Sequence, residues 1–240
     1  MMFRVQFFIF ALSLAIVPLV HATEGGGLPD QNSPKCDPAE LKGKTSIDVK
    51  FVRVVDGDTV KINYNGKLLS VRMLTMDTPE THYEGQSQGF WGDTAAAKLA
   101  ELTRGVTLAR IELGEEACDH YGRILGYLWV GEKNINREMI AEGLAVNFCV
   151  YPSLKHCEEF ANLVQKNIDD KRGIFSGDPE VDLPYNWRRE ISNRPYDKFV
   201  GNLETFEVVS PEKQEQVPVS QRVFFMKKSA IKAPFHYVGK

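Results

Sequence analysis

Hydrophobic and polar positions alternate along two neighbouring segments in the first half of the chain. Apolar residues stand at Val60, Ile62 and Tyr64 in the first segment and at Leu69, Val71 and Met73 in the second. A period of two is typical of strands with one buried face. Asn65-Gly66 between the segments indicates a tight hairpin turn. We expect order to begin near Ser46, with an earlier strand that runs into the turn at 56–58.

Strand and helix patterns follow one another over the next hundred residues. Two more strands are expected, over 106–113 and 124–130. Helical spacing of apolar residues occurs at Trp91, Ala95, Leu99 and Leu102, at Met139, Ile140 and Leu144, and at Cys157, Phe160, Ala161, Val164 and Ile168. We expect Asn136 to cap the second helix and Gly173 to end the third. Five short strands with three helices predict an α+β fold built on a five-stranded OB-type β-barrel over 45–176.

The first 22 residues have the pattern of a secretory signal peptide. Arg4 precedes an uncharged apolar run that Pro18 interrupts, and small residues at Val20 and Ala22 suit cleavage after Ala22. An uncleaved anchor is the weaker alternative, because the run is short for a membrane span of roughly 20 residues. We therefore expect a secreted or periplasmic protein without stable membrane association after cleavage. Residues 23–44, rich in Gly and Pro, are expected to form a flexible N-terminal arm.

The residue composition and the hydrophobic pattern change after residue 176. Residues 177–196 contain three prolines, and Trp187-Arg188-Arg189 adds aromatic and basic character without a clear period. Short apolar pieces at 199–200 and 223–225 surround a charged stretch. We expect 177–240 to be a small C-terminal extension with modest structure of its own and of uncertain role.

Four cysteines become informative if the protein is exported. Cys36, Cys118, Cys149 and Cys157 all follow the signal segment, and an even number in an oxidising compartment favours two disulfides. Their spacing is not that of a zinc site. Of the three possible pairings we favour Cys149 with Cys157 and Cys36 with Cys118, without excluding the other two.

Composition is that of an ordinary soluble domain, but the charge is informative. Hydrophobic residues make up 43% and charged residues 25% of the chain, and the formal net charge is −3. Proteins that bind nucleic acid usually show a basic surface. Any attraction for nucleic acid must therefore be local to the site, and non-specific binding should be weak.

Three short segments concentrate reactive side chains. The first is Val55-Asp56-Gly57-Asp58-Thr59-Val60, with two carboxylates in a turn. The second runs from Arg72 to Thr81 and reads RMLTMDTPET, with an arginine on a strand, two carboxylates and a stiffening proline. The third is Asp119-His120-Tyr121-Gly122-Arg123, a polar loop that opens into a strand. Each segment alone is a weak signal, because turns often carry such residues.

Together and in this order, the three segments resemble the staphylococcal nuclease family over residues 45–176. The resemblance implies a five-stranded OB barrel with three helices, one Ca²⁺ ion, and hydrolysis of DNA and RNA to 3′-phosphate products. It also implies roles for nine residues. Asp58, Asp77 and the Thr78 carbonyl match the calcium ligands, Arg72, Glu80 and Arg123 match the catalytic groups, and Asp119, Tyr121 and Tyr151 match substrate-binding positions.

The implied chemistry explains why these residue types occur together. Attack of water on a phosphodiester adds negative charge at phosphorus, so catalysis needs counter-charge and an aligned water molecule. Hard cations prefer oxygen ligands, and Asp58 and Asp77 would leave positions for waters and phosphate. Guanidinium groups suit phosphate because their planar fork donates two hydrogen bonds. Glu80 matches the general base or the group that orients the water.

The sequence departs from the family pattern before the last helix. Tyr151 matches one of two tyrosine positions, but Cys149 occupies the other, so we expect weaker substrate binding with the same chemistry. The tail faintly resembles a small Cys/His metal-binding module whose ligands are absent here. A loosely docked extension is at least an equal alternative for that segment.

Two other functions remain open at this point. An OB barrel can bind single-stranded nucleic acid or a protein partner without cleaving it, although the acidic charge balance weighs against this. The exported protein could also have a structural or host-interaction role carried by the tail. We expect a monomer that acts on DNA and RNA. The sequence does not decide the preferred nucleic acid or whether cleavage starts inside the strand.

Overall fold

The computed structural model describes residues 34–239. The predicted signal peptide and the first part of the N-terminal arm lie outside the described residues. The described part of the arm is not irregular throughout, because it contains the short helix α1 (Pro38–Leu41). Asp37 caps this helix by accepting a hydrogen bond from the amide of Ala39 at 2.8 Å. Cys36 in the same segment is bonded to Cys118.

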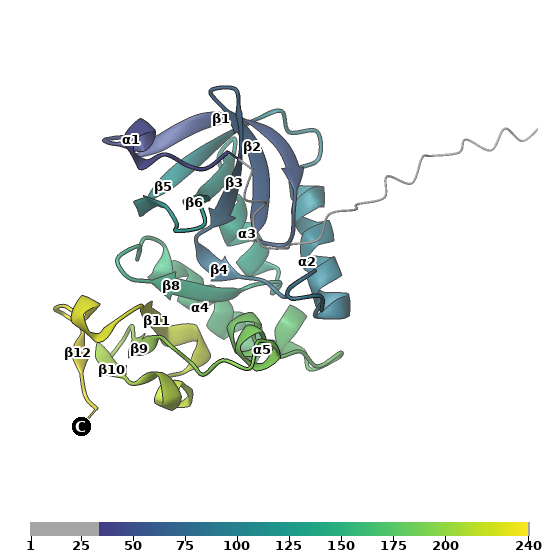
Figure 1. Ribbon diagram of the computed structural model, residues 1–240. Coiled ribbons are helices and arrows are strands. Elements are labelled where there is room, and N and C mark those ends of the chain that lie inside the picture. Colours follow the sequence, from purple (N-terminus) through teal and green to yellow (C-terminus); the bar gives the residue numbers. More distant parts are fainter. Residues whose placement is uncertain (1–33, 240) are drawn as a thin grey trace, which may run out of the picture.

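Five strands close into the predicted barrel (Figure 1). They are β1 (Ser46–Val54), β2 (Thr59–Tyr64), β3 (Lys67–Met73), β5 (Leu108–Cys118) and β6 (Ile124–Val130), with β7 (Lys133–Asn134) beside β6. Neighbouring strands are antiparallel except where β3 meets β6, and this parallel pairing closes the barrel. The fold class predicted from the sequence is therefore confirmed.

The hairpin of β2 and β3 forms as its alternating pattern predicts. Val60, Ile62 and Val71 are buried in the barrel interior. Asn65 and Gly66 have φ values of 51° and 81°, the left-handed conformation that a two-residue hairpin turn requires. The register places Thr59 opposite Arg72. The turn that carries Asp58 therefore lies beside the end of β3.

Three helices pack against the barrel. They are α2 (Gly89–Leu102), α3 (Ile135–Ala141) and α4 (Cys157–Asp169). The predicted cap of α3 is wrong by two residues, because Asn134 accepts the capping hydrogen bond from the amide of Arg137. Asn136 lies inside the helix and is fully buried, where its amide accepts from the amide of Leu128 and donates to the carbonyl of Leu74. These bonds satisfy backbone groups that would otherwise be unpaired inside the protein.

A second sheet joins the barrel domain to the extension. Its strands run in the order β12-β10-β9-β11-β8-β4. The bounds are β4 (Thr75–Asp77), β8 (Val146–Val150), β9 (Phe199–Asn202), β10 (Glu207–Val209), β11 (Arg222–Phe225) and β12 (His236–Tyr237). Figure 1 shows β4 and β8 between the barrel and the strands of the extension. One sheet therefore runs from the C-terminus to the strand that carries Asp77.

The prediction of an extension with modest structure is wrong. Its strand β11 pairs in parallel with β8, and Val200, Val208, Val223 and Phe225 are buried. The segment before α4 begins with β8, a strand absent from the five predicted ones, which is hydrogen-bonded on both sides. The described part of the extension also contains α5 (Pro184–Ile191) and three 3-10 turns, Pro211–Gln216, Val219–Gln221 and Lys228–Ala230. A further 3-10 turn, Gly173–Phe175, precedes the extension.

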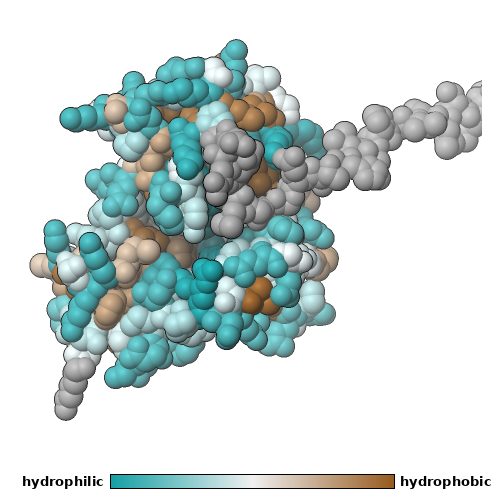
Figure 2. Space-filling model, in the orientation of Figure 1, coloured by the Kyte–Doolittle hydropathy of each residue, from teal (hydrophilic) through white to brown (hydrophobic). Residues whose placement is uncertain are grey.

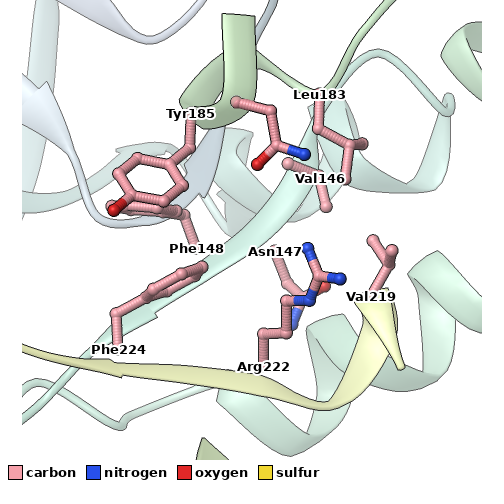
Figure 3. Close-up of a pocket in the computed structure, with 9 residues that line it drawn as sticks. Val146, Asn147, Phe148, Leu183, Tyr185, Val219, Arg222 and Phe224 are labelled. Atoms are coloured by element: carbon pink, nitrogen blue, oxygen red, sulfur yellow. The ribbon is translucent and has the colours of Figure 1, made fainter. Parts of the chain in front are cut away.

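The helix α5 is fixed to the second sheet by the ring of Tyr185 (Figure 3). This ring lies 5.7 Å from that of Phe148 on β8 and 5.4 Å from that of Phe224 on β11, measured between centroids. The same three aromatic residues line one side of a small pocket, and the guanidinium of Arg222 lines the other. Aromatic contacts of this kind make α5 part of the packed interior.

Both favoured disulfides are present, Cys36–Cys118 and Cys149–Cys157. Among the residues that the structure describes, helices are too short or too polar to cross a membrane. Hydrophilic residues cover most of the visible surface of the barrel and of the extension, with apolar residues in smaller patches (Figure 2). Scattered apolar residues of this kind are normal on a protein surface.

Candidate active site

Asp58 and Asp77 converge on the guanidinium of Arg72. The Nη2 atom of Arg72 lies 3.1 Å from Asp58 Oδ2 and 2.8 Å from Asp77 Oδ1. The Nη1 atom donates to the carbonyls of Met73 and Met76, which fixes the guanidinium at the end of β3. The Asp77 side chain has no exposed surface. Two carboxylates, one from the turn before β2 and one from the end of β4, therefore face the same point.

The turn before β2 is shaped to place Asp58 there. Asp56 Oδ1 accepts a hydrogen bond from the amide of Asp58 at 3.0 Å, which closes the turn. Gly57 lies so close to the next segment that an added Cβ would stand 2.5 Å from Thr78 Oγ1 and 2.8 Å from the Cβ of Ala95. Asp58 Oδ2 also accepts from the amide of Thr78 at 3.2 Å. The glycine thus lets the two acidic segments touch.

Glu80 is held next to these groups by the start of α2. Its amide donates to Gln88 Oε1 at 3.0 Å. An added Cβ at Gly92 would stand 2.5 Å from the Glu80 carbonyl oxygen, so the helix packs directly on this loop. The Glu80 side chain is 17% exposed and points to the same cluster.

A residue of the extension, Arg188 on α5, completes the cluster. Its Nη1 and Nη2 atoms donate to Asp77 Oδ1 at 3.1 Å and Asp77 Oδ2 at 2.7 Å. Nη1 also donates to Glu80 Oε1 at 2.6 Å. The sequence marked 187–189 only as a basic and aromatic stretch. Nothing in that stretch shows that it contacts residues more than a hundred positions earlier.

Burial and mutual repulsion change the acidity of this cluster. Burial raises the pKa of Asp56 to about 8, and the charges of Asp58 and Glu80 add to the rise. Burial also raises the pKa of Glu80 to about 7, where Arg188 opposes the rise and Asp58 adds to it. Burial would lower the pKa of Arg188, but Asp77 and Glu80 outweigh it, so that pKa is raised. Acidic groups with raised pKa values near neutrality are typical of acid–base sites.

Arg123 belongs to a neighbouring loop. Its Nε donates to Asp119 Oδ2 at 2.7 Å, and the guanidinium carbon lies 5.5 Å from the centroid of the Tyr121 ring. Asp119 Oδ1 also accepts from the amides of Tyr121 and Arg123, so this carboxylate shapes the loop. The pairing of β3 with β6 places Arg123, the residue just before β6, close to the strand that carries Arg72. Within the described residues, Arg123 forms no ion pair with the Asp58 and Asp77 cluster.

Tyr151 is engaged in packing against the extension. Its ring stacks on that of Phe225 with the centroids 5.3 Å apart and the planes at 23°. It is half-buried in the second hydrophobic cluster, beside Cys149 and Cys157. The structure does not bring this ring into the carboxylate cluster, so its predicted contact with substrate stays a prediction.

The donor set fits a hard divalent cation. The described residues include no group of three or more His, Cys, Asp and Glu side chains placed to hold a metal ion. The predicted calcium ligands, two aspartates and the Thr78 carbonyl, include only two acidic side chains. Asp58 and Asp77 already converge on one positively charged nitrogen, Arg72 Nη2, at 3.1 and 2.8 Å. Their oxygens, with the Thr78 carbonyl, are the ligands that Ca²⁺ prefers.

Comparison of the sequence with known proteins identifies related proteins and a family. Residues 70–177 match the family described as staphylococcal nuclease homologue. The thermonuclease of Staphylococcus hyicus is 32% identical over 139 residues, which cover 58% of this chain and 81% of that protein. Two Bacillus subtilis (strain 168) proteins are also similar. The SPbeta prophage-derived endonuclease YokF is 36% identical over 135 residues, and endonuclease YncB is 35% identical over 141 residues.

The chain spans 45% of the length of YokF and 66% of the length of YncB, and the alignments cover 55% and 58% of this chain. The match to the thermonuclease extends over most of that protein, and the fold is the barrel that the family resemblance implies. The chain therefore belongs to the staphylococcal nuclease family.

Proposed function

We propose that the protein is an exported, calcium-dependent nuclease that hydrolyses phosphodiester bonds of DNA and RNA and leaves 3′-phosphate ends. The observation that carries the proposal is the convergence of Asp58 and Asp77 on one cationic nitrogen, with Glu80 beside them. The similar proteins named endonuclease and thermonuclease support the reaction class. Two disulfides support an oxidising compartment.

Asp58, Asp77 and the Thr78 carbonyl would hold the ion. A Ca²⁺ ion held there would supply positive charge to the phosphate and would make the attacking water more acidic. Glu80 accepts the proton of the attacking water, because its raised pKa is near the pH at which a general base works best. The 17% exposure of its side chain leaves room for water to reach it.

Arg72 and Arg123 stabilise the charge that develops on the phosphate oxygens. Arg72 also orients both aspartates, since its Nη2 atom contacts each of them. Arg123 is aimed by its bond to Asp119, and the exposed ring of Tyr121 beside it offers a surface on which a base can stack. These positions give the phosphate and the base neighbouring contacts on one loop.

The test is cleavage of single-stranded DNA and of RNA by purified residues 23–240 in Ca²⁺, in Mg²⁺ and in EDTA, with identification of the ends. The proposal predicts 3′-phosphate ends that require Ca²⁺. Glu80→Gln removes the base and should lower kcat by at least about a hundredfold. Glu84→Gln, on the exposed part of the same loop, is the matched control and should leave kcat unchanged. Binding without cleavage in every metal would favour the OB-fold binding module instead.

A further inference from the structure

Segment 179–188 of the extension is fastened to the active-site loop at several points. The carbonyl of Asp182 accepts from Gln88 Nε2 at 2.8 Å, and the carbonyl of Pro179 accepts from Trp91 Nε1 at 2.7 Å. The ring of Trp187 lies 6.2 Å from that of Tyr83. Because Tyr185 is also buried in the second sheet, α5 is docked on both sides. The guanidinium of Arg188 is therefore held in a fixed position within the site.

The contacts of Arg188 fall on the residues that the proposed ion needs. Asp77 Oδ2 accepts from Arg188, and Asp77 Oδ1 accepts from both Arg72 and Arg188. Both oxygens of this buried carboxylate are thus occupied by guanidinium groups. Glu80 Oε1 accepts from the same Arg188 nitrogen. A cation that binds Asp77 therefore competes with guanidinium contacts at both carboxylate oxygens.

The charge balance points the same way. Asp58, Asp77 and Glu80 face two guanidinium groups, and Arg188 is the one that comes from outside the barrel domain. A positive charge close to buried carboxylates lowers the attraction for a second cation, and the effect is strong where water is excluded. The same charge compensates Asp77 and Glu80 when no ion is present, since buried charges without partners are costly.

We propose that Arg188 is a built-in competitor of the divalent cation for Asp77 and Glu80. This inference rests on the metal site of the proposed function. Through Arg188 the extension lowers the affinity for calcium and stabilises the ion-free site. The concentration of calcium that the protein needs is therefore set by a residue outside the family domain.

The test compares Arg188→Met with Arg189→Met on the same helix. Arg189 is a matched control because its guanidinium pairs with Asp197 and lies over the Tyr185 ring, away from the carboxylates. Calcium binding is measured by titration calorimetry, and thermal unfolding is followed with Ca²⁺ or EDTA. Arg188→Met should bind Ca²⁺ at least about tenfold more tightly than wild type. Its Tm should also rise more when Ca²⁺ is added. Arg189→Met should match wild type in both measurements.

Loss of Arg188 leaves Asp77 and Glu80 less compensated, so Arg188→Met can fail to fold in EDTA. Arg188→Lys then serves, because lysine keeps the charge but lacks the planar fork that holds both oxygens of Asp77. It should bind Ca²⁺ a few times more tightly than wild type, about two- to fivefold. Calcium binding no tighter in either variant than in wild type, or no binding by any of them, would overturn the inference. Tighter binding without cleavage would refute only the proposed function.

Discussion

Arg72 Nη2 lies 3.1 Å from Asp58 Oδ2, although the two residues stand on opposite sides of a hairpin. The contact follows from the register, which pairs Thr59 with Arg72 and so brings the preceding turn to the end of β3. The same nitrogen donates to Asp77. The position of Arg72 thus determines the distance between the two proposed calcium ligands.

Replacing Arg72 by lysine should lower kcat by about a hundred- to a thousandfold, because lysine cannot hold two carboxylates and two backbone carbonyls at once. The rate is measured on single-stranded DNA with saturating Ca²⁺. Arg53→Lys, an exposed position on β1, is the matched control and should keep the wild-type rate. An Arg72→Lys rate within threefold of wild type, roughly, would remove Arg72 from the catalytic groups.

Gly57→Ala should destabilise the protein by about 1–3 kcal/mol, because the new methyl group would overlap Thr78 and Ala95. It should also lower activity, since Asp58 is displaced with the turn. Gly66→Ala is the comparison, where φ is +81° and nothing lies within 4 Å of the added Cβ. That variant should lose stability through backbone strain but retain activity. Equal activities of Gly57→Ala and Gly66→Ala, measured without denaturant, would show that the close packing at Gly57 does not position Asp58.

The stability of the ion-free protein should fall as pH rises from about 5 to about 8. The ordinary carboxyl pKa values of 3.8 and 4.5 are raised in the folded protein to about 8 at Asp56 and about 7 at Glu80. The folded state therefore holds protons that the unfolded chain has already released, and the free energy of unfolding decreases with pH. The decrease should be at least about 1–2 kcal/mol.

Urea unfolding in EDTA at three pH values measures this dependence. Asp56→Asn removes one of the two groups and should flatten the curve. Asp93→Asn, on the exposed side of α2, serves as the control and should leave the curve as in wild type. Stability that does not fall between pH 5 and pH 8, roughly, would contradict raised pKa values at Asp56 and Glu80, because carboxylates ionised in both states add no pH dependence.

The two disulfides should differ in their contribution to stability. Cys36–Cys118 closes a sequence separation of 82, and Cys149–Cys157 closes one of 8. Loop entropy predicts that replacing the first pair by alanine costs about 2 kcal/mol more than replacing the second. The amide of Cys36 also donates to the carbonyl of Gly122, beside Arg123, so the first variant alone should lose activity. Equal or reversed losses in urea unfolding would contradict this ranking.

The barrel and its helices could be predicted from the sequence because their patterns are long. β2 and β3 alternate over several residues, and α4 buries Cys157, Phe160, Ala161 and Val164 as the stripe predicts. The grouping of Asp58, Asp77 and Glu80 followed from the family resemblance, since the two motifs that carry them lie on adjoining elements. Asn134 rather than Asn136 caps α3, a choice decided by the buried bonds of Asn136 to distant strands.

The extension and Arg188 could not be predicted. Strands β9 to β12 are two to four residues long, too short for a period to be visible. They form by pairing with one another and, through β11, with β8. β8 itself lies between two strands, so its residues are buried without clear alternation. Arg188 meets Glu80 only through this tertiary arrangement, since 108 positions separate them in the chain.

The most direct test of the account is a double-mutant cycle at Asp77 and Glu80. Cleavage rates of Asp77→Asn, Glu80→Gln and the double variant are compared with wild type on one single-stranded DNA substrate in Ca²⁺. If the two carboxylates act in one catalytic centre, the double variant should lose little more than the worse single variant. Losses that multiply, with each residue contributing independently, would contradict a single centre.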